Sequence, residues 1–239
     1  MTQQAFNKIA AGLREAADGK AYAFPIVRLV WLTPQADLLI ARLARVSSPA
    51  NEGNDATAER LIGYMLRHQH MSPFEMASMC LEIVTTRDVA RQLLRHRSFS
   101  FQEFSQRYAD VDALPEAPFR AARMQDIKNR QNSLPTDDDE LRQWWDEAQG
   151  LIADMTGAIY SNALSKGIAK EVARAVLPEG LTTSRLYMAG TIRSWLHFCA
   201  LRRGPETQLE TRRVAELAWA ELRAGLPMVA GAWEAVGNG

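Results

Sequence analysis

The chain has 239 residues, of which 47% are hydrophobic and 23% are charged, a balance typical of a globular protein. Its 28 basic and 28 acidic side chains cancel, which argues against a nucleic-acid binder that works by bulk charge. The N-terminal segment has no apolar signal core, and no run of about 18 apolar residues occurs. We therefore expect a cytoplasmic protein that contacts neither nucleic acid nor membrane.

The two cysteines, Cys80 and Cys199, lie in apolar stretches without a further Cys or His at metal-ligand spacing. This pattern favours buried structural thiols over a disulfide or a zinc site. The acidic run Asp137–Glu140 is most simply a solvated helix start, so we expect no metal site.

The hydrophobic pattern predicts alternating helices and strands in the first half of the chain. In order, we expect a helix at 6–18, a strand at 26–32, helices at 36–47 and 56–69, a strand at 77–86, a helix at 88–96 and a strand at 99–111.

The second half is predicted to be mostly helical after a surface excursion at 109–140. Helices are expected at 140–167, 168–178, 182–203 and 210–225. The prediction is a single α/β (α+β) domain over residues 1–239, with a mixed sheet, flanking helices and a mostly helical C-terminal half.

Polar side chains are dense between Arg87 and Tyr108. In a helix Gln92 and Arg95 would share a face, and in a strand Glu103, Ser105 and Arg107 would point to one side. A turn between them could direct both faces into one pocket, suited to an anion that carries a planar heterocycle. The alternative is a set of solvated surface charges.

The spacing Arg95-His96-Arg97-x-x-Ser100-x-x-Glu103-x-Ser105-x-Arg107-Tyr108 resembles the signature of flavin-dependent thymidylate synthases. Further blocks occur in the family's order over about residues 25–220: ARVS at 44–47, HMSPFE at 70–75, ARAVLP at 173–178, IRSWLHFCALR at 192–202 and TQLETR at 207–212. The resemblance implies reductive methylation of dUMP to dTMP, with methylenetetrahydrofolate as carbon donor, FAD as hydride carrier and NADPH as reductant. It also implies a homotetramer whose active sites are shared between subunits.

The resemblance assigns roles by position in the motifs. The FAD-binding positions correspond to Ser47, Ser72, Arg95, His96, Arg97, Glu103 and His197. The dUMP-binding positions correspond to Gln92, Arg95, Glu103, Ser105, Arg107, Arg174 and Arg202.

Three of these residues are expected to take part in catalysis. The resemblance implies that Ser105 and Arg107 hold the nucleotide phosphate, and we assign Ser105 to binding rather than attack because no general base is spaced to activate it. Arg202 would contact the uracil ring and stabilise negative charge on it. His96 would either stack on flavin or transfer a proton.

The chain departs from the family pattern at Gln102 and Thr207, and over Met188–Thr191, where a common Asn is missing. Two alternatives to the synthase therefore stay open. One is a pyrimidine nucleotide hydroxymethylase on the same fold, in which water captures the methylene adduct. The other is a non-catalytic nucleotide- or RNA-binding module that uses the arginine cluster.

Overall fold

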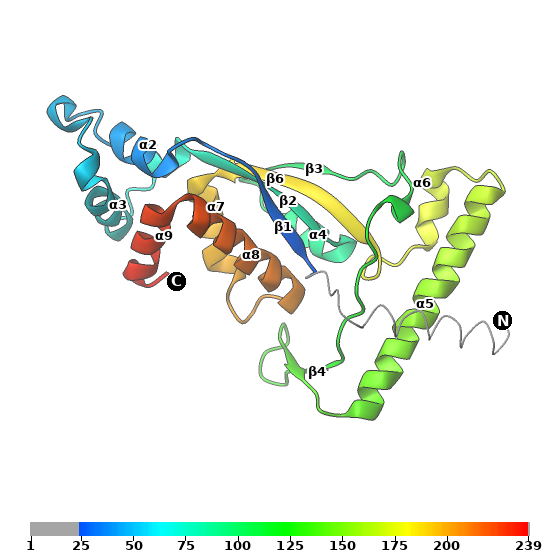
Figure 1. The fold of residues 1–239 in the computed structure, drawn as a ribbon. Coiled ribbons are helices and arrows are strands. Elements are labelled where there is room, and N and C mark those ends of the chain that lie inside the picture. Colours follow the sequence, from blue (N-terminus) through cyan, green and yellow to red (C-terminus); the bar gives the residue numbers. More distant parts are fainter. Residues whose placement is uncertain (1–23, 239) are drawn as a thin grey trace.

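A four-stranded sheet forms the centre of the molecule, in the order β1 (Ile26–Leu32), β2 (Ser78–Thr86), β6 (Thr183–Thr191) and β3 (Ser100–Glu103) (Figure 1). The computed structural model describes residues 24–238, so the helix expected at 6–18 lies outside the described part. The strands predicted at 26–32 and 77–86 are confirmed. The α/β (α+β) class is confirmed as well, but all three strand pairings are antiparallel, so the expected mixed sheet is wrong.

Strand β6 corrects the helix predicted at 182–203. Only its second half is helical, as α7 (Ile192–Arg202). In β6 the buried side chains of Leu186 and Met188 alternate with the exposed ones of Arg185 and Tyr187, a period of two that belongs to a strand. The strand and the helix follow each other without a loop between them. The apolar residues therefore form one continuous run, in which the change from strand spacing to helix spacing was overlooked.

Strand β3 is shorter than the strand predicted at 99–111. The Phe104 N–H still donates to the Arg185 carbonyl (2.8 Å), and the chain then turns away from the sheet. The Ser105 carbonyl accepts hydrogen bonds from the N–H groups of Tyr108 and Ala109, both at 3.1 Å. The prediction that Glu103, Ser105 and Arg107 alternate along one strand is therefore wrong, because a turn begins between the first and the last of them.

Helices cover one face of the sheet and form the core with it. These are α4 (Arg87–Leu93), α7 and α8 (Leu209–Gly225) (Figure 1). The Trp195 indole of α7 is fully buried and donates a 3.0 Å hydrogen bond to the Met79 carbonyl of β2. A side chain at Gly190 would not fit, because its Cβ would lie 2.5 Å from the Phe99 ring.

The remaining helices lie at the two ends of the sheet (Figure 1). At one end, α2 (Ala36–Leu43) and α3 (Ala58–Arg67) confirm two predicted helices with shorter bounds, and they pack with α9 (Pro227–Trp233), which the sequence analysis missed. At the other end, the predicted long helix is confirmed as α5 (Asp139–Ser165). The helix expected at 168–178 consists of α6 (Lys170–Ala173) and a 3-10 turn at Arg174–Val176.

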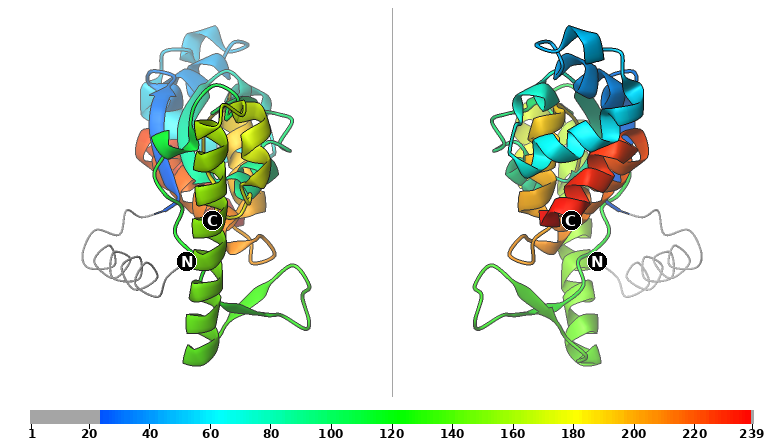
Figure 2. Two further views of the ribbon diagram at one scale, coloured as in Figure 1. Left: turned by 90° about the vertical axis from the view of Figure 1, so that its right-hand side faces the viewer. Right: turned by 90° about the vertical axis from the view of Figure 1, so that its left-hand side faces the viewer.

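The excursion at 109–140 is confirmed and contains a hairpin of β4 (Arg123–Gln125) and β5 (Ser133–Pro135). Figure 2 shows the hairpin and one end of α5 projecting away from the rest of the molecule.

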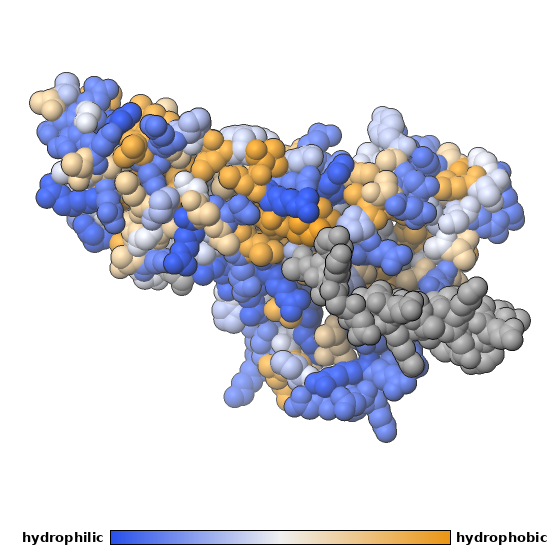
Figure 3. Space-filling view, in the orientation of Figure 1, coloured by the Kyte–Doolittle hydropathy of each residue, from blue (hydrophilic) through white to orange (hydrophobic). Residues whose placement is uncertain are grey.

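On the surface, apolar residues gather over the middle of the molecule (Figure 3), and Leu29, Val30 and Trp31 of β1 are exposed. Among residues 24–238, no helix combines the length and apolar character that crossing a membrane requires.

Candidate active site

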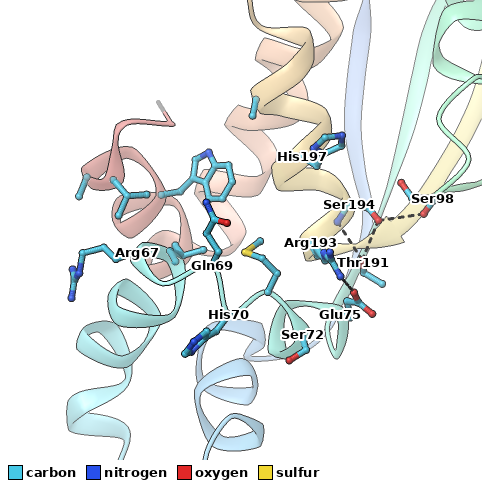
Figure 4. Close-up of a pocket in the computed structure, with 16 residues that line it drawn as sticks. Arg67, Gln69, His70, Ser72, Glu75, Ser98, Thr191, Arg193, Ser194 and His197 are labelled. Atoms are coloured by element: carbon cyan, nitrogen blue, oxygen red, sulfur yellow. Dashed lines mark hydrogen bonds and ion pairs between the residues drawn. The ribbon is translucent and has the colours of Figure 1, made fainter.

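A cleft of about 1540 Å³ opens between the end of α3, the 3-10 turn at Ser72–Glu75, the start of α7 and the segment around the end of α9. Its polar side chains approach from these separate parts of the chain (Figure 4). They include two arginines, two histidines and several neutral donors: Arg67, Gln69, His70, Ser72, Thr191, Arg193, Ser194 and His197. The cleft is larger than the roughly 300–1000 Å³ that holds a drug-sized ligand.

The N-terminus of α7 lies at the edge of this cleft. The Thr191 side chain caps the helix by accepting a 3.3 Å hydrogen bond from the Ser194 N–H. A helix N-terminus carries partial positive charge and free N–H donors, which favours an anion there. Arg193 adds a full positive charge, although in this structure it forms an ion pair with Glu75.

The arginine-rich motif reaches the same cleft through Ser98, whose carbonyl accepts a 3.3 Å hydrogen bond from the Ser194 hydroxyl (Figure 4). Ser98 follows Arg95, His96 and Arg97 directly. The motif and the start of α7 are therefore adjacent, as a shared ligand site requires.

His96 contacts Arg202 at the end of α7, where Arg202 Nε donates a 2.9 Å hydrogen bond to His96 Nε2. The imidazole is half-buried, with ring centroids 5.0 Å from Phe198 and 6.4 Å from Phe99. Burial, helped by the charge of Arg202, lowers the pKa of His96 to about 4. His96 is thus neutral at pH 7, with its proton on Nδ1, because an arginine nitrogen can only donate.

Gln92 is held in α4 by two partners from the start of α8. Its amide nitrogen donates to the Gln208 side chain (2.5 Å), and its oxygen accepts from the Thr211 hydroxyl (2.9 Å). Arg95 lies in the turn after α4 and is exposed. Gln92, Arg95, His96 and Arg202 form what we call the first group of predicted site residues, since all belong to α4, the turn after it, or α7.

The second group consists of Glu103, Ser105, Arg107 and Arg174, from the end of β3 and the segment around α6. The Glu103 carboxylate accepts a 2.6 Å hydrogen bond from the Ser184 hydroxyl and lies 3.6 Å from Arg87 Nη1. Arg107 Nε lies 3.5 Å from the Glu171 carboxylate, three residues before Arg174. Both Arg107 and Glu171 are exposed, so this pairing leaves the guanidinium available to a stronger anion.

Comparison with known proteins decides the family. The family described as "Thymidylate synthase complementing protein" matches residues 28–228. The chain belongs to this family. It is 51% identical over 175 residues to a probable flavin-dependent thymidylate synthase of Paramecium bursaria Chlorella virus 1, covering 73% of this chain and 80% of that protein. It is 47% identical over 196 residues to a flavin-dependent thymidylate synthase of Synechocystis, covering 82% and 88%.

A solved structure of a nucleotide methylase has the same fold. A UMP/dUMP methylase, PolB from Streptomyces cacaoi bound with 5-Br UMP, superposes with a TM-score of 0.77 at 30% sequence identity. The match covers 90% of this chain and 95% of that chain. The long antiparallel strand β6 and the helices around it thus belong to a fold already known for a nucleotide methylase.

The structure brings only some of the family's predicted site residues together. Ser72 and His197 both line the cleft, whereas exposed Ser47 and Arg97 are not among the lining residues. Among residues 24–238, no hydrogen bond or ion pair joins the first group to the second.

Several residues that line the cleft were not identified from the sequence. His70 and Arg193 lie inside quoted family blocks, so a closer reading of those blocks could have found them. Arg67 and Trp233 lie in no motif. Only the packing of α3 against α9 in the folded structure shows that they line the cleft.

The donors of the cleft suit a flavin dinucleotide, which combines two phosphates with planar rings. Arg193 and the α7 N-terminus are suitable for the phosphates. Leu66, Met71 and Trp233 supply apolar contacts for a ring. The residues present therefore fit this cofactor in size, charge and apolar character.

Neither cysteine is a candidate nucleophile. Both thiols are buried. Burial raises the pKa of Cys80, and it raises the pKa of Cys199 to about 12. Since the thiolate is the reactive form, both residues are unreactive at neutral pH, as the sequence led us to expect.

Proposed function

We propose that this protein is a flavin-dependent thymidylate synthase, which converts dUMP to dTMP with methylenetetrahydrofolate as carbon donor and NADPH as reductant. The observation that carries the proposal is the position of the arginine-rich motif. Its first half lies against Arg202 and borders the large cleft, and its second half lies beside α6. The names of the relatives support the same activity, including the viral protein, the Synechocystis protein and PolB.

The second group would bind the phosphate of dUMP. Ser105 offers a hydroxyl and Arg107 a guanidinium, and a charge-assisted hydrogen bond of this kind contributes roughly 1.5–3 kcal/mol. Arg174 follows Glu171, the ion-pair partner of Arg107, by three residues and would add a second guanidinium from the segment around α6. Glu103, already bonded to Ser184, would fix the sugar or the base by accepting a hydrogen bond.

The first group would bind the uracil ring. Arg202 is held by His96 through Nε. Among residues 24–238 the two terminal nitrogens of its guanidinium have no hydrogen-bond partner, so they can donate to uracil oxygens. Positive charge placed there stabilises the electron density that develops on the ring as its carbon five attacks the carbon donor. Neutral His96 orients Arg202 without adding a competing charge.

FAD, when bound, would supply the redox chemistry of the reaction. Ser72 and His197 would contact it in the cleft, with Arg95, His96, Arg97 and Glu103 at the border with the nucleotide. Ser47 would reach it only if the loop after α2 faced a cleft of another subunit.

We also propose a homotetramer with shared active sites. In α5 only Gln149 and Tyr160 are buried among 27 residues, while Trp144 is 60%, Leu151 53% and Met155 50% exposed. Apolar exposure on this scale favours a protein partner. Within residues 24–238 no hydrogen bond or ion pair joins the first group to the second, and a second copy could complete each site.

The test is a titration of the purified protein with FAD, followed by dUMP, monitored by the flavin absorbance spectrum. We expect FAD to bind and dUMP to perturb the spectrum. A protein that binds polynucleotides in a strongly salt-dependent way, and binds no FAD, would instead support the nucleic-acid-binding alternative.

A further inference from the structure

The end of α9 and the residues after it form one wall of the cleft. Trp233, Ala235 and Val236 line it, beside Leu66 of α3 and Met71. Trp233 lies beyond residue 228, where the family match ends, and in none of the sequence blocks that carry the resemblance. Its role in this cleft is therefore unassigned.

The wall is fixed at the start of α9. The carboxylate of buried Asp37, in α2, accepts hydrogen bonds from the N–H groups of Met228 and Val229, both at 3.0 Å. N–H groups in the first turn of a helix have no acceptor within the helix. The negative charge of the carboxylate also interacts favourably with the positive end of the helix dipole. Asp37 therefore ties the first turn of α9 to α2.

The wall is fixed at the other end as well. Trp219 Nε1 of α8 donates a 3.2 Å hydrogen bond to the carboxylate of Glu234, the residue that follows Trp233. Arg203 lies over the Trp219 ring, 5.1 Å from its centroid, which positions the donor. These bonds hold the backbone on both sides of Trp233, whose indole packs partly against the core and lines the cleft. A backbone held in this way loses less freedom when a ligand binds.

The opposite side of the cleft, formed by α7, is polar and carries the positive charge of Arg193. Figure 4 shows Arg193, Ser194 and His197 on α7, across from Arg67 and Gln69, which lie near the end of α3 on the same side as α9. Gln69 has a φ of 56°, a left-handed conformation that a residue other than glycine adopts at some cost. The cleft thus joins an apolar aromatic wall to a set of phosphate donors.

We infer that Trp233 is a cofactor-binding residue whose indole packs against a planar ring of FAD. This inference rests on the proposed function. FAD is the preferred occupant because Ser72 and His197, which the family resemblance assigns to flavin, line the same cleft as Trp233. Stacking a ring on an aromatic side chain is sequence-tolerant and strong enough to affect affinity measurably.

The test compares FAD affinity, measured by the change in flavin fluorescence, among four folded proteins. Trp233→Leu keeps apolar bulk but removes the aromatic ring, and Trp233→Phe keeps a ring. Met228→Ala is the matched control, because Met228 packs on the core from the same helix but does not line the cleft. We expect about tenfold weaker FAD binding in Trp233→Leu and near wild-type binding in the other two.

Each other outcome is decisive. Unchanged FAD affinity in Trp233→Leu overturns the inference, and so does an equal loss in Met228→Ala, which would mean that α9 packing alone matters. Weaker binding of NADPH or of the folate, with FAD affinity unchanged, overturns the choice of FAD. If the wild-type protein binds no FAD, the proposed function fails, a result distinct from failure of the Trp233 assignment.

Discussion

Arg202 Nε and His96 Nε2 are joined by a 2.9 Å hydrogen bond, which connects the end of α7 to the turn that follows α4. The two residues are 106 positions apart in the sequence, yet each lies in one of the family motifs quoted above. The bond requires a neutral imidazole, and burial provides it by lowering the pKa of His96 to about 4. The protein therefore orients a cation with a group that carries no charge at neutral pH.

This arrangement predicts a pH-dependent stability. The folded-state pKa of about 4 lies below the ordinary value of 6.5, so between these pH values the unfolded chain binds more protons than the native one. The free energy of unfolding should fall as the pH drops from 6.5 to 4, by at most roughly 3 kcal/mol from this residue. Urea unfolding at several pH values measures the slope.

His96→Gln is the control for that measurement, since glutamine keeps a hydrogen-bond acceptor but does not titrate. The difference between wild type and variant isolates His96 from the carboxylates that also titrate. Parallel stability curves for the two proteins would show that His96 is not buried in a neutral state.

Arg107→Ala should weaken dUMP binding by about 10- to 100-fold, the loss expected for a charge-assisted hydrogen bond to phosphate. The fold should persist, because the ion pair of Arg107 with Glu171 is exposed and contributes little to stability. Isothermal titration with dUMP gives the affinity. Arg142→Ala, which removes another arginine paired with surface carboxylates, should leave dUMP affinity unchanged, and an equal loss there would refute a specific phosphate contact.

Shared active sites predict complementation between two impaired variants, assayed at a dUMP concentration too low for turnover by either variant alone. Arg95→Ala damages the first group and Arg107→Ala the second. In mixed tetramers, some sites would combine an intact first group from one subunit with an intact second group from another, restoring up to about a quarter of wild-type activity for random assembly. Activity assays on co-refolded variants test this. Mixtures as inactive as the separate variants would mean that each site is built from a single chain.

The cysteines should be dispensable for turnover. Because burial raises the pKa of both thiols, Cys80→Ala and Cys199→Ala should retain the wild-type turnover number, and iodoacetamide should not inactivate the native protein at neutral pH. Rapid inactivation that dUMP protects against would point to a thiol nucleophile and against the flavin-dependent route.

The sequence predicted helices and strands well where the hydrophobic residues keep a single spacing, that of a helix or that of a strand, along the whole element. The strand at 26–32 and the long helix beginning near residue 139 are examples. It failed over 182–203, because β6 runs directly into α7 and the burial of Leu186 and Met188 depends on neighbouring strands rather than on local propensity.

The sequence could indicate those residues of the candidate site that lie within the family motifs. Ser72 and His197 share a cleft, and His96 contacts Arg202. The extended segment from Glu103 to Arg107 was not predictable, because a turn at Ser105 replaces it. Trp233 could not be found either, since its place beside α3 arises from packing between elements distant in sequence.

The most direct test of the proposed function is identification of the product by mass spectrometry after incubation with dUMP, methylenetetrahydrofolate, NADPH and FAD. We predict dTMP, formed only when NADPH is present. A product carrying a hydroxymethyl group and formed without NADPH would contradict reductive methylation and favour the hydroxymethylase, and no product with FAD bound would contradict synthase activity on dUMP.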